Sequence, residues 1–279
     1  MRSAPLVLRS ETARDGAAPP WLPLLQDLTR TLPDWAVWKN VDRALAGMGD
    51  VDSVAPPTEW PTIARAFARW AREHDLGPVV ACTHIPVGIE LIAVPAPRTA
   101  FIELGAKARR IYRGSTVYTA SAFLPLMEMD PRGFRRLRPG AEGLFKLLLG
   151  GVHRDGTPDP RALTEKRAPA LIAEDPEGAR RASALLGVAG PAAFAAATAA
   201  ARGEWDRPAM LVVQAWALAR APLDPMTLAR KIDYQIRVKS RCPILRVLFR
   251  EHRQVPADRD AWLAEVRRTH DAIDADHGG

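Results

Sequence analysis

The spacing of apolar residues changes near residue 155, and this change limits the folds open to the chain more than any other feature. Before it, short apolar runs are separated by proline and glycine, which is typical of strands joined by turns. After it, apolar residues recur at helical spacing in one segment after another. The pattern predicts an α+β fold, in which a mixed β-sheet domain with flanking helices is followed by an all-helical C-terminal domain.

Composition suggests where these parts begin and end. Residues 1–20 carry charges and prolines in place of the apolar core of a signal peptide, and we expect a flexible tail there. The sheet domain is expected over 21–155 and the helical domain over 156–279, with DGTPDP at 155–160 as the linker. No stretch is apolar enough to predict a transmembrane segment, so the sequence favours a cytoplasmic protein.

Six elements are expected early in the sheet domain. WAVWKN at 35–40 and DVDSVA at 50–55 predict two short paired strands, separated by a glycine turn at 47–49. The segment 58–77 predicts a helix, since Ile63, Phe67 and Trp70 recur at helical spacing between a candidate cap, Thr58, and a stop signal, Gly77. Three β-rich runs follow at 77–86, 88–97 and 99–114, and a further helix is expected over 141–149.

The formal net charge of +7 favours an anionic partner such as a nucleotide, a nucleic acid or a membrane surface. Eight basic residues and two acidic ones lie between Arg230 and Arg253, on a predicted pair of amphipathic helices that could contact RNA. We favour the alternative, in which their apolar stripe packs on the domain and the charges stay in water.

Several chemistries are disfavoured. Two cysteines without CxxC spacing do not suit a disulfide framework or a structural zinc site. The chain lacks GxxxxGK[ST] and a well-placed GxGxxG, which argues against P-loop and Rossmann nucleotide binding. No local motif supports a Ser/His/Asp or Cys/His nucleophile.

The most informative motif is the aspartate pair in GDVDSVAP, residues 49–56. On a strand, Asp50 and Asp52 project from the same face, so their carboxylates repel each other. Burying both without a counter-charge is unfavourable. A divalent cation removes that penalty, and Mg²⁺ in particular uses one or two carboxylates together with water and phosphate oxygens. The pair therefore predicts Mg²⁺ bound to Asp50 and Asp52.

The order strand, glycine turn, Asp-x-Asp strand and helix resembles the nucleotidyltransferase superfamily of the DNA polymerase beta type. WAVWKN, GDVDSVAP, FIEL, YRGSTVY and RPGAEGLFKLLL resemble, more narrowly, bacterial nucleotidyltransferase-like proteins of uncertain substrate. The resemblance covers about residues 35–155. It implies a metal site at the aspartates, a bound nucleoside triphosphate and transfer of a nucleotidyl group. Two departures stand out: Gly47-Met48-Gly49 lacks the usual serine of the turn, and the third carboxylate of the family has no obvious equivalent.

Glu103 is the leading candidate for that third carboxylate, with Glu90 as its rival and Gly105 as the position where an aspartate would be expected. The glycine turn, through Gly47 and Gly49, and the cations Lys39, Lys107 and Arg113 are candidate phosphate contacts. Two arginine clusters, 109–113 and 132–138, either line an anionic cleft or form a charged surface paired with Glu128, Asp130 and Glu142.

Together these features suggest a Mg²⁺-dependent nucleotidyltransferase that moves a nucleoside monophosphate from a nucleoside triphosphate to a hydroxyl or phosphate acceptor. The acceptor, a small molecule or a protein, is not specified by the sequence. Two alternatives stay open: a catalytically degenerate protein of the same fold that binds a nucleotide or a partner, and an RNA-binding protein that uses the basic C-terminal helices.

Overall fold

The computed structural model describes residues 21–47, 50–76, 79–84, 87–93, 102–150, 152–159, 167–225, 227 and 229. A seven-stranded sheet has the strand order β3-β4-β5-β2-β1-β9-β8, and β6 and β7 form a separate hairpin. The strands are β1 (Ala36–Lys39), β2 (Val51–Val54), β3 (Val79–His84), β4 (Gly88–Ala93), β5 (Ile102–Lys107), β6 (Arg109–Tyr112), β7 (Ser115–Thr119), β8 (Met127–Met129) and β9 (Arg135–Leu137). Since β2 runs parallel to β5 and β1 parallel to β9 while the other neighbours are antiparallel, the sheet is mixed.

Helices account for most of the remaining described structure. The α-helices are α1 (Trp21–Thr31), α2 (Val41–Leu45), α3 (Trp60–Glu73), α4 (Ala120–Phe123), α5 (Pro139–Gly150), α7 (Ala168–Glu174), α8 (Pro176–Ala184), α9 (Gly190–Ala201) and α10 (Arg207–Arg220). Four short 3-10 helices connect them: η1 (Pro57–Glu59), η2 (Leu124–Leu126), η3 (Gly187–Ala189) and η4 (Ala221–Leu223). The α+β fold with a mixed sheet is thus confirmed.

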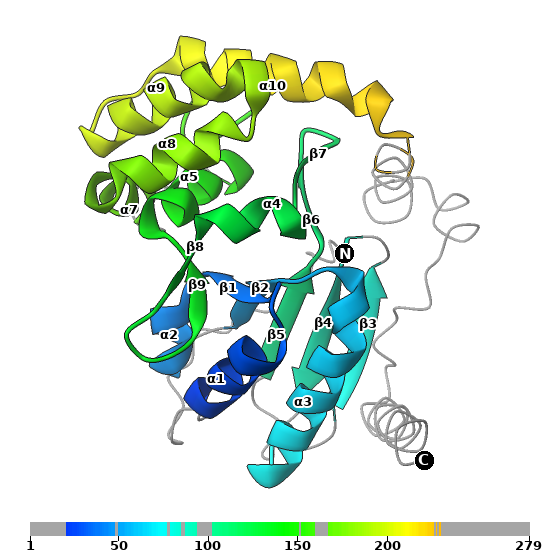
Figure 1. Ribbon diagram of the computed structural model, residues 1–279. Helices are drawn as coiled ribbons and strands as arrows, with labels where there is room; N and C mark the ends of the chain where they lie inside the picture. The colour runs from blue at the N-terminus through cyan, green and yellow to red at the C-terminus, as the bar shows by residue number, and fades with distance from the viewer. Residues whose placement is uncertain are drawn as a thin grey trace, which may run out of the picture.

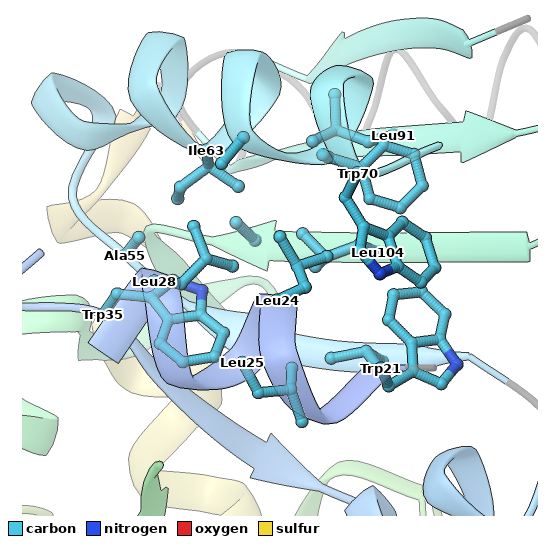
Figure 2. Packing of buried hydrophobic residues seen from close by; sticks show 14 of the residues in the cluster. Trp21, Leu24, Leu25, Leu28, Trp35, Ala55, Ile63, Trp70, Leu91 and Leu104 are labelled. Carbon is cyan, nitrogen blue, oxygen red and sulfur yellow. The ribbon is translucent and has the colours of Figure 1, made fainter. Parts of the chain in front are cut away.

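One face of the sheet is covered by α1 and α3 (Figure 1). The apolar residues of these helices meet those of β2, β4 and β5 in the first core cluster, and Figure 2 shows Leu24, Leu28 and Ile63 over the strands. The indole of Trp21 stacks on that of Trp70, with 4.6 Å between ring centroids. This packing fixes which face of β2 points away from α1 and α3.

The second core cluster joins the opposite face of the sheet to the helices that follow it. It contains Ala36, Trp38 and Val54 from the sheet, and it continues through the β6–β7 hairpin into α5 and α7–α10. These helices stack together beyond the hairpin (Figure 1). The alanine-rich α9 packs closely against its neighbours because its small side chains let the helices approach.

The elements agree with the sequence patterns in type but differ at their ends. β1 and β2 pair as expected, and the structure shows that the pairing is antiparallel; α2 lies between them, and Asp50 stands just before β2. The helix expected over 58–77 is α3, which begins at Trp60 and ends at Glu73. Thr58 lies in η1 and does not cap α3, so that prediction was wrong.

The segment expected to be a linker is held in place. Residues 152–159 form a turn closed by a bridge between Val152 and Pro158. Three side chains from α10 and the residues before it donate to its carbonyls: Trp205 to Gly156, Arg207 to Asp155 and Gln214 to His153. The described part of 155–160 is therefore packed onto the helices that follow it. The tail at 1–20 and the basic segment Arg230–Arg253 lie outside the described residues.

Candidate active site

Asp50 and Asp52 lie on the face of β2 that points away from α1 and α3. Val51 and Ala55 belong to the first core cluster, whereas Val54, two residues after Asp52, belongs to the second. The aspartates therefore share the second face, together with Glu103 and Lys107 of β5 and Glu90 of β4, which the register places beside them. We call these five residues and Lys39 the charged face. Asp52 is 8% exposed, while the side chain of Asp50 reaches solvent.

A β-bulge brings Lys39 onto the charged face. Strict alternation along β1 would place Lys39 on the same side as Val37, in the first core cluster. The register instead shifts between Val37 and Lys39, so that Lys39 pairs with Asp52. Its Nζ lies 2.6 Å from Oδ2 of Asp52. The bulge thus supplies the counter-charge that the buried carboxylate requires.

The third carboxylate beside the pair is Glu103. Val51 is the register partner of Leu104, so continuing the ladder by one residue sets Asp50 beside Glu103. Glu90 is one strand further from β2, and its carboxylate leans over Gly105, where an added Cβ would meet Oε2 of Glu90. Glu90 is also paired with Lys107. The residue beside Asp52 is therefore Gly105, so this position on β5 carries no side chain.

The charges of the three carboxylates are coupled. Burial is the largest influence that raises the pKa of Asp50, and repulsion from Asp52 raises it further, while Lys39 opposes both. A hydrogen bond between Asp50 and Asp52, which needs one of them protonated, acts in the same direction as burial. Burial also raises the pKa of Glu103, followed by the charges of Asp50 and Asp52. The raised pKa values indicate that the carboxylates lie close together and that the neighbouring cations do not fully neutralise their negative charge.

The cations of the site are perturbed in the complementary way. Burial, and after it the charge of Arg110, lower the pKa of Lys107 to about 8, while the charge of Asp52 opposes the change. Lys107 forms an ion pair with Glu90, and this pair also favours the charged ammonium. Burial and the charge of Arg110 therefore set the direction of the shift, and the pKa of Lys107 lies below its usual range.

Arg110 lies closer to this site than Arg113 does. Both belong to the first arginine cluster, and the sequence did not single out Arg110. Its Cζ lies 3.6 Å from the centre of a ring of Trp38, and its charge acts on Asp52 and Lys107. Arg113 occupies the tip of the β6–β7 hairpin with a φ of 51° and donates to the carbonyl of Val152. The alternation of β6 after Lys107 could have indicated that one arginine of the cluster turns toward the sheet, but not which one.

The second arginine cluster is structural. Arg132 pairs with Asp130 and Asp42, Arg136 pairs with Glu128 and Asp130, and Arg138 pairs with Asp175. The guanidinium of Arg135 donates to the carbonyls of Leu32, Pro33 and Trp35. The cluster thus forms a charged surface paired with carboxylates, which is one of the two alternatives predicted from the sequence. Glu142, which was expected to take part in it, pairs with Lys146 instead. None of these four arginines faces the aspartate pair with a free guanidinium.

Part of the glycine turn lies outside the description. Gly47 has a φ of 78°, a conformation that favours glycine, and its N–H donates to the carbonyl of Ala44 at the end of α2. Met48 and Gly49 are outside the described residues. Phosphate contact by Gly47 and Gly49 stays a prediction.

The donor chemistry of the site fits Mg²⁺. In the described ranges, no group of three or more His, Cys, Asp and Glu side chains is arranged to hold a metal ion on its own. Mg²⁺ does not require such a group, because one or two carboxylates are completed by water and phosphate oxygens. Oδ2 of Asp52 is enclosed, and its partner in the described part of the chain is the ammonium of Lys39, as an ion pair. Asp50 and Asp52 are thus the residues that would hold the ion.

Comparison with known proteins adds little. No protein-family model matches the chain, and no curated protein matches it. The solved structure of JHP933 from Helicobacter pylori is similar over 77% of this chain and 96% of that one, with 10% identity and a TM-score of 0.31. A similarity at this level supports neither a shared family nor a shared activity. In the described part of the chain, no helix has both the length and the apolar character needed to cross a membrane.

Proposed function

We propose that this protein is a Mg²⁺-dependent nucleotidyltransferase that transfers a nucleoside monophosphate from a nucleoside triphosphate to a hydroxyl or phosphate acceptor. The observation that supports this best is the convergence of Asp50, Asp52 and Glu103 on one face of the sheet, with Lys39 and Lys107 beside them. The two aspartates suit Mg²⁺, which uses one or two carboxylates together with water and phosphate oxygens, and the lysines suit those phosphate oxygens.

The residues have separate roles in this proposal. Asp50 and Asp52 hold Mg²⁺, which when bound neutralises negative charge on the phosphates. Lys39 and Lys107 bind phosphate oxygens. Glu103, whose pKa is raised, accepts the proton of the acceptor oxygen. The acceptor oxygen forms a bond to the α-phosphorus, the bond from that phosphorus to the bridging oxygen breaks, and pyrophosphate leaves.

Titration calorimetry with ATP, CTP, GTP and UTP in the presence of Mg²⁺ tests the proposal. We expect Asp50→Asn and Asp52→Asn each to weaken binding of the preferred nucleotide by about tenfold or more, because each loses a metal-binding carboxylate. Glu73→Gln is the matched control, since Glu73 is an exposed carboxylate on α3, which covers the opposite face of the sheet. Equal binding by the parent and both aspartate variants would defeat the proposal.

Three observations favour a second candidate function, binding without turnover. Asp52 already has a cationic partner in Lys39, Glu90 has one in Lys107, and Gly105 offers no carboxylate beside Asp52. A protein of this kind would bind the nucleotide and leave it intact. Pyrophosphate release from the bound nucleotide separates the two candidates, since only the transferase produces it.

A further inference from the structure

Arg110 and Trp38 form a stacked pair at the edge of the charged face. Trp38 is 4% exposed and precedes Lys39 on the bulged strand β1. The guanidinium of Arg110, on β6, lies over its ring with 3.6 Å between Cζ and the ring centroid. Because the side chain of Lys39 also approaches this indole, with Nζ 5.0 Å from the centroid, Trp38 is the common platform for two cations.

Three enclosed N–H groups of this pair lack an acceptor. Nε1 of Trp38 and both Nε and Nη2 of Arg110 are buried, and none of them donates a hydrogen bond to any residue that the structure describes. Folded proteins satisfy nearly all their buried polar groups, so three such donors on two stacked side chains are an exception that calls for an explanation. Indole and guanidinium groups have donors only, so each lacks an acceptor here, and an anion is the acceptor that suits the charged guanidinium.

Arg110 also lacks an ion-pair partner. Lys39 and Lys107, its cationic neighbours, are paired with Asp52 and Glu90, whereas no carboxylate in the described part of the chain lies within ion-pair distance of Arg110. Burial lowers the pKa of Arg110 to about 10, with a smaller opposing effect of Asp52, so the group remains charged at neutral pH. The pair therefore presents a positive charge and unused donors together.

We propose that Arg110 and Trp38 form an oxyanion subsite that binds a phosphate group next to the aspartate pair. A guanidinium offers two parallel N–H groups, which match two oxygens of one phosphate. The identity of the ligand rests on the proposed function: the phosphate belongs either to the polyphosphate tail of the nucleotide or to a phosphorylated acceptor. Both sources present the same chemistry to the subsite.

Binding of inorganic tripolyphosphate and of glycerol 3-phosphate to the full chain, by calorimetry in EDTA, tests the subsite. We expect Arg110→Gln to weaken binding of whichever probe binds more tightly by about tenfold or more. Arg110→Lys should recover only part of that loss, because an ammonium lacks the two parallel N–H groups of a guanidinium. Trp38→Phe keeps an aromatic ring under Arg110 and removes one donor, so a smaller loss of about threefold is expected. Arg109→Gln, a change at the neighbouring arginine of β6, is the matched control and should leave binding within about twofold.

The two probes distinguish the sources of the phosphate. Tighter, Arg110-dependent binding of tripolyphosphate assigns the subsite to the nucleotide tail, and tighter binding of glycerol 3-phosphate assigns it to an acceptor. The subsite is refuted if the parent binds neither probe, or if Arg110→Gln and Trp38→Phe, both folded by circular dichroism, bind as the parent does. Because EDTA removes metal, binding of the probe then depends on Arg110 and not on Mg²⁺, so failure of the transferase proposal and failure of the subsite give different results.

Discussion

The ion pair between Lys39 and Asp52 allows a quantitative prediction, because one partner is nearly enclosed and the other is partly solvated. Lys39→Met keeps the length of the side chain and removes its charge, which leaves Asp52 without its counter-charge. At 2.6 Å and an effective dielectric constant of about 20, the gross attraction is about 6 kcal/mol. Desolvation of both groups offsets most of it.

The side chains of Lys39 and Asp52 are 27% and 12% exposed, so the loss on removing one partner should fall below the range for fully buried pairs. We expect the free energy of unfolding to decrease by about 2 kcal/mol. In a chain of this size, that corresponds to a decrease in Tm of about 4–8 °C. Urea denaturation at neutral pH measures the first quantity and thermal unfolding the second.

A double-mutant cycle identifies the cause. In Lys39→Met/Asp52→Asn the uncompensated charge is gone, and at least about half of the lost stability should return. Arg30→Met is the control, since Arg30 is 76% exposed in its pair with Asp27 and should change stability by less than about 0.5 kcal/mol. If Asp52 also binds Mg²⁺, the ion should raise the Tm of Lys39→Met more than that of the parent. A change below about 0.5 kcal/mol in Lys39→Met, or no recovery in the double variant, would refute the reasoning.

Three further predictions concern other charged groups. Asp50→Asn should raise Tm at neutral pH: the raised pKa of Asp50 means that the folded state holds this proton more tightly than the unfolded state, so ionisation at neutral pH is unfavourable to folding. The gain should shrink as the pH falls below that pKa, and a lower Tm at neutral pH would contradict it. Asp175→Ala should lower stability by about 3 kcal/mol in urea denaturation, because the carboxylate accepts hydrogen bonds from Arg138, Gly140 and Gly178; an unchanged midpoint would show that these bonds are replaced. Tripolyphosphate binding should take up a proton between about pH 8 and 9, where Lys107, with its pKa of about 8, is partly neutral until an anion favours the ammonium. Calorimetry in buffers of different ionisation enthalpy measures this uptake, and its absence at that pH, or its persistence in Lys107→Met, would count against the assignment.

Local patterns predicted the elements around the site well. The short apolar runs predicted two strands, which are β1 and β2 in the structure. The helical spacing of Ile63, Phe67 and Trp70 predicted a helix, and these three residues lie on the buried side of α3. Alternation on a strand also indicated that Asp50 and Asp52 would share a face. These features depend on residues close in sequence, so one segment is enough to reveal them.

The arrangement that completes the site depends on pairing between distant segments. The bulge at Trp38 changes the face on which Lys39 lies, and the alternation within WAVWKN gives no sign of it. The sequence already favoured Glu103 over Glu90, but the parallel register of β2 and β5, which sets Glu103 beside Asp50, is not specified by a sequence pattern. Arg110 could be separated from Arg109 and Arg113 only after the hairpin and its stacking on Trp38 were seen.

The bonds that α10 and its preceding residues make to the turn at 152–159 have a practical consequence for dividing the chain. Composition suggests a cut near residue 155, but a helical fragment that starts there lacks His153, whose carbonyl accepts from Gln214. Gln214 is 4% exposed, so its amide would lose a partner in an enclosed position. A fragment that begins before Val152 would retain that partner and the bridge that closes the turn.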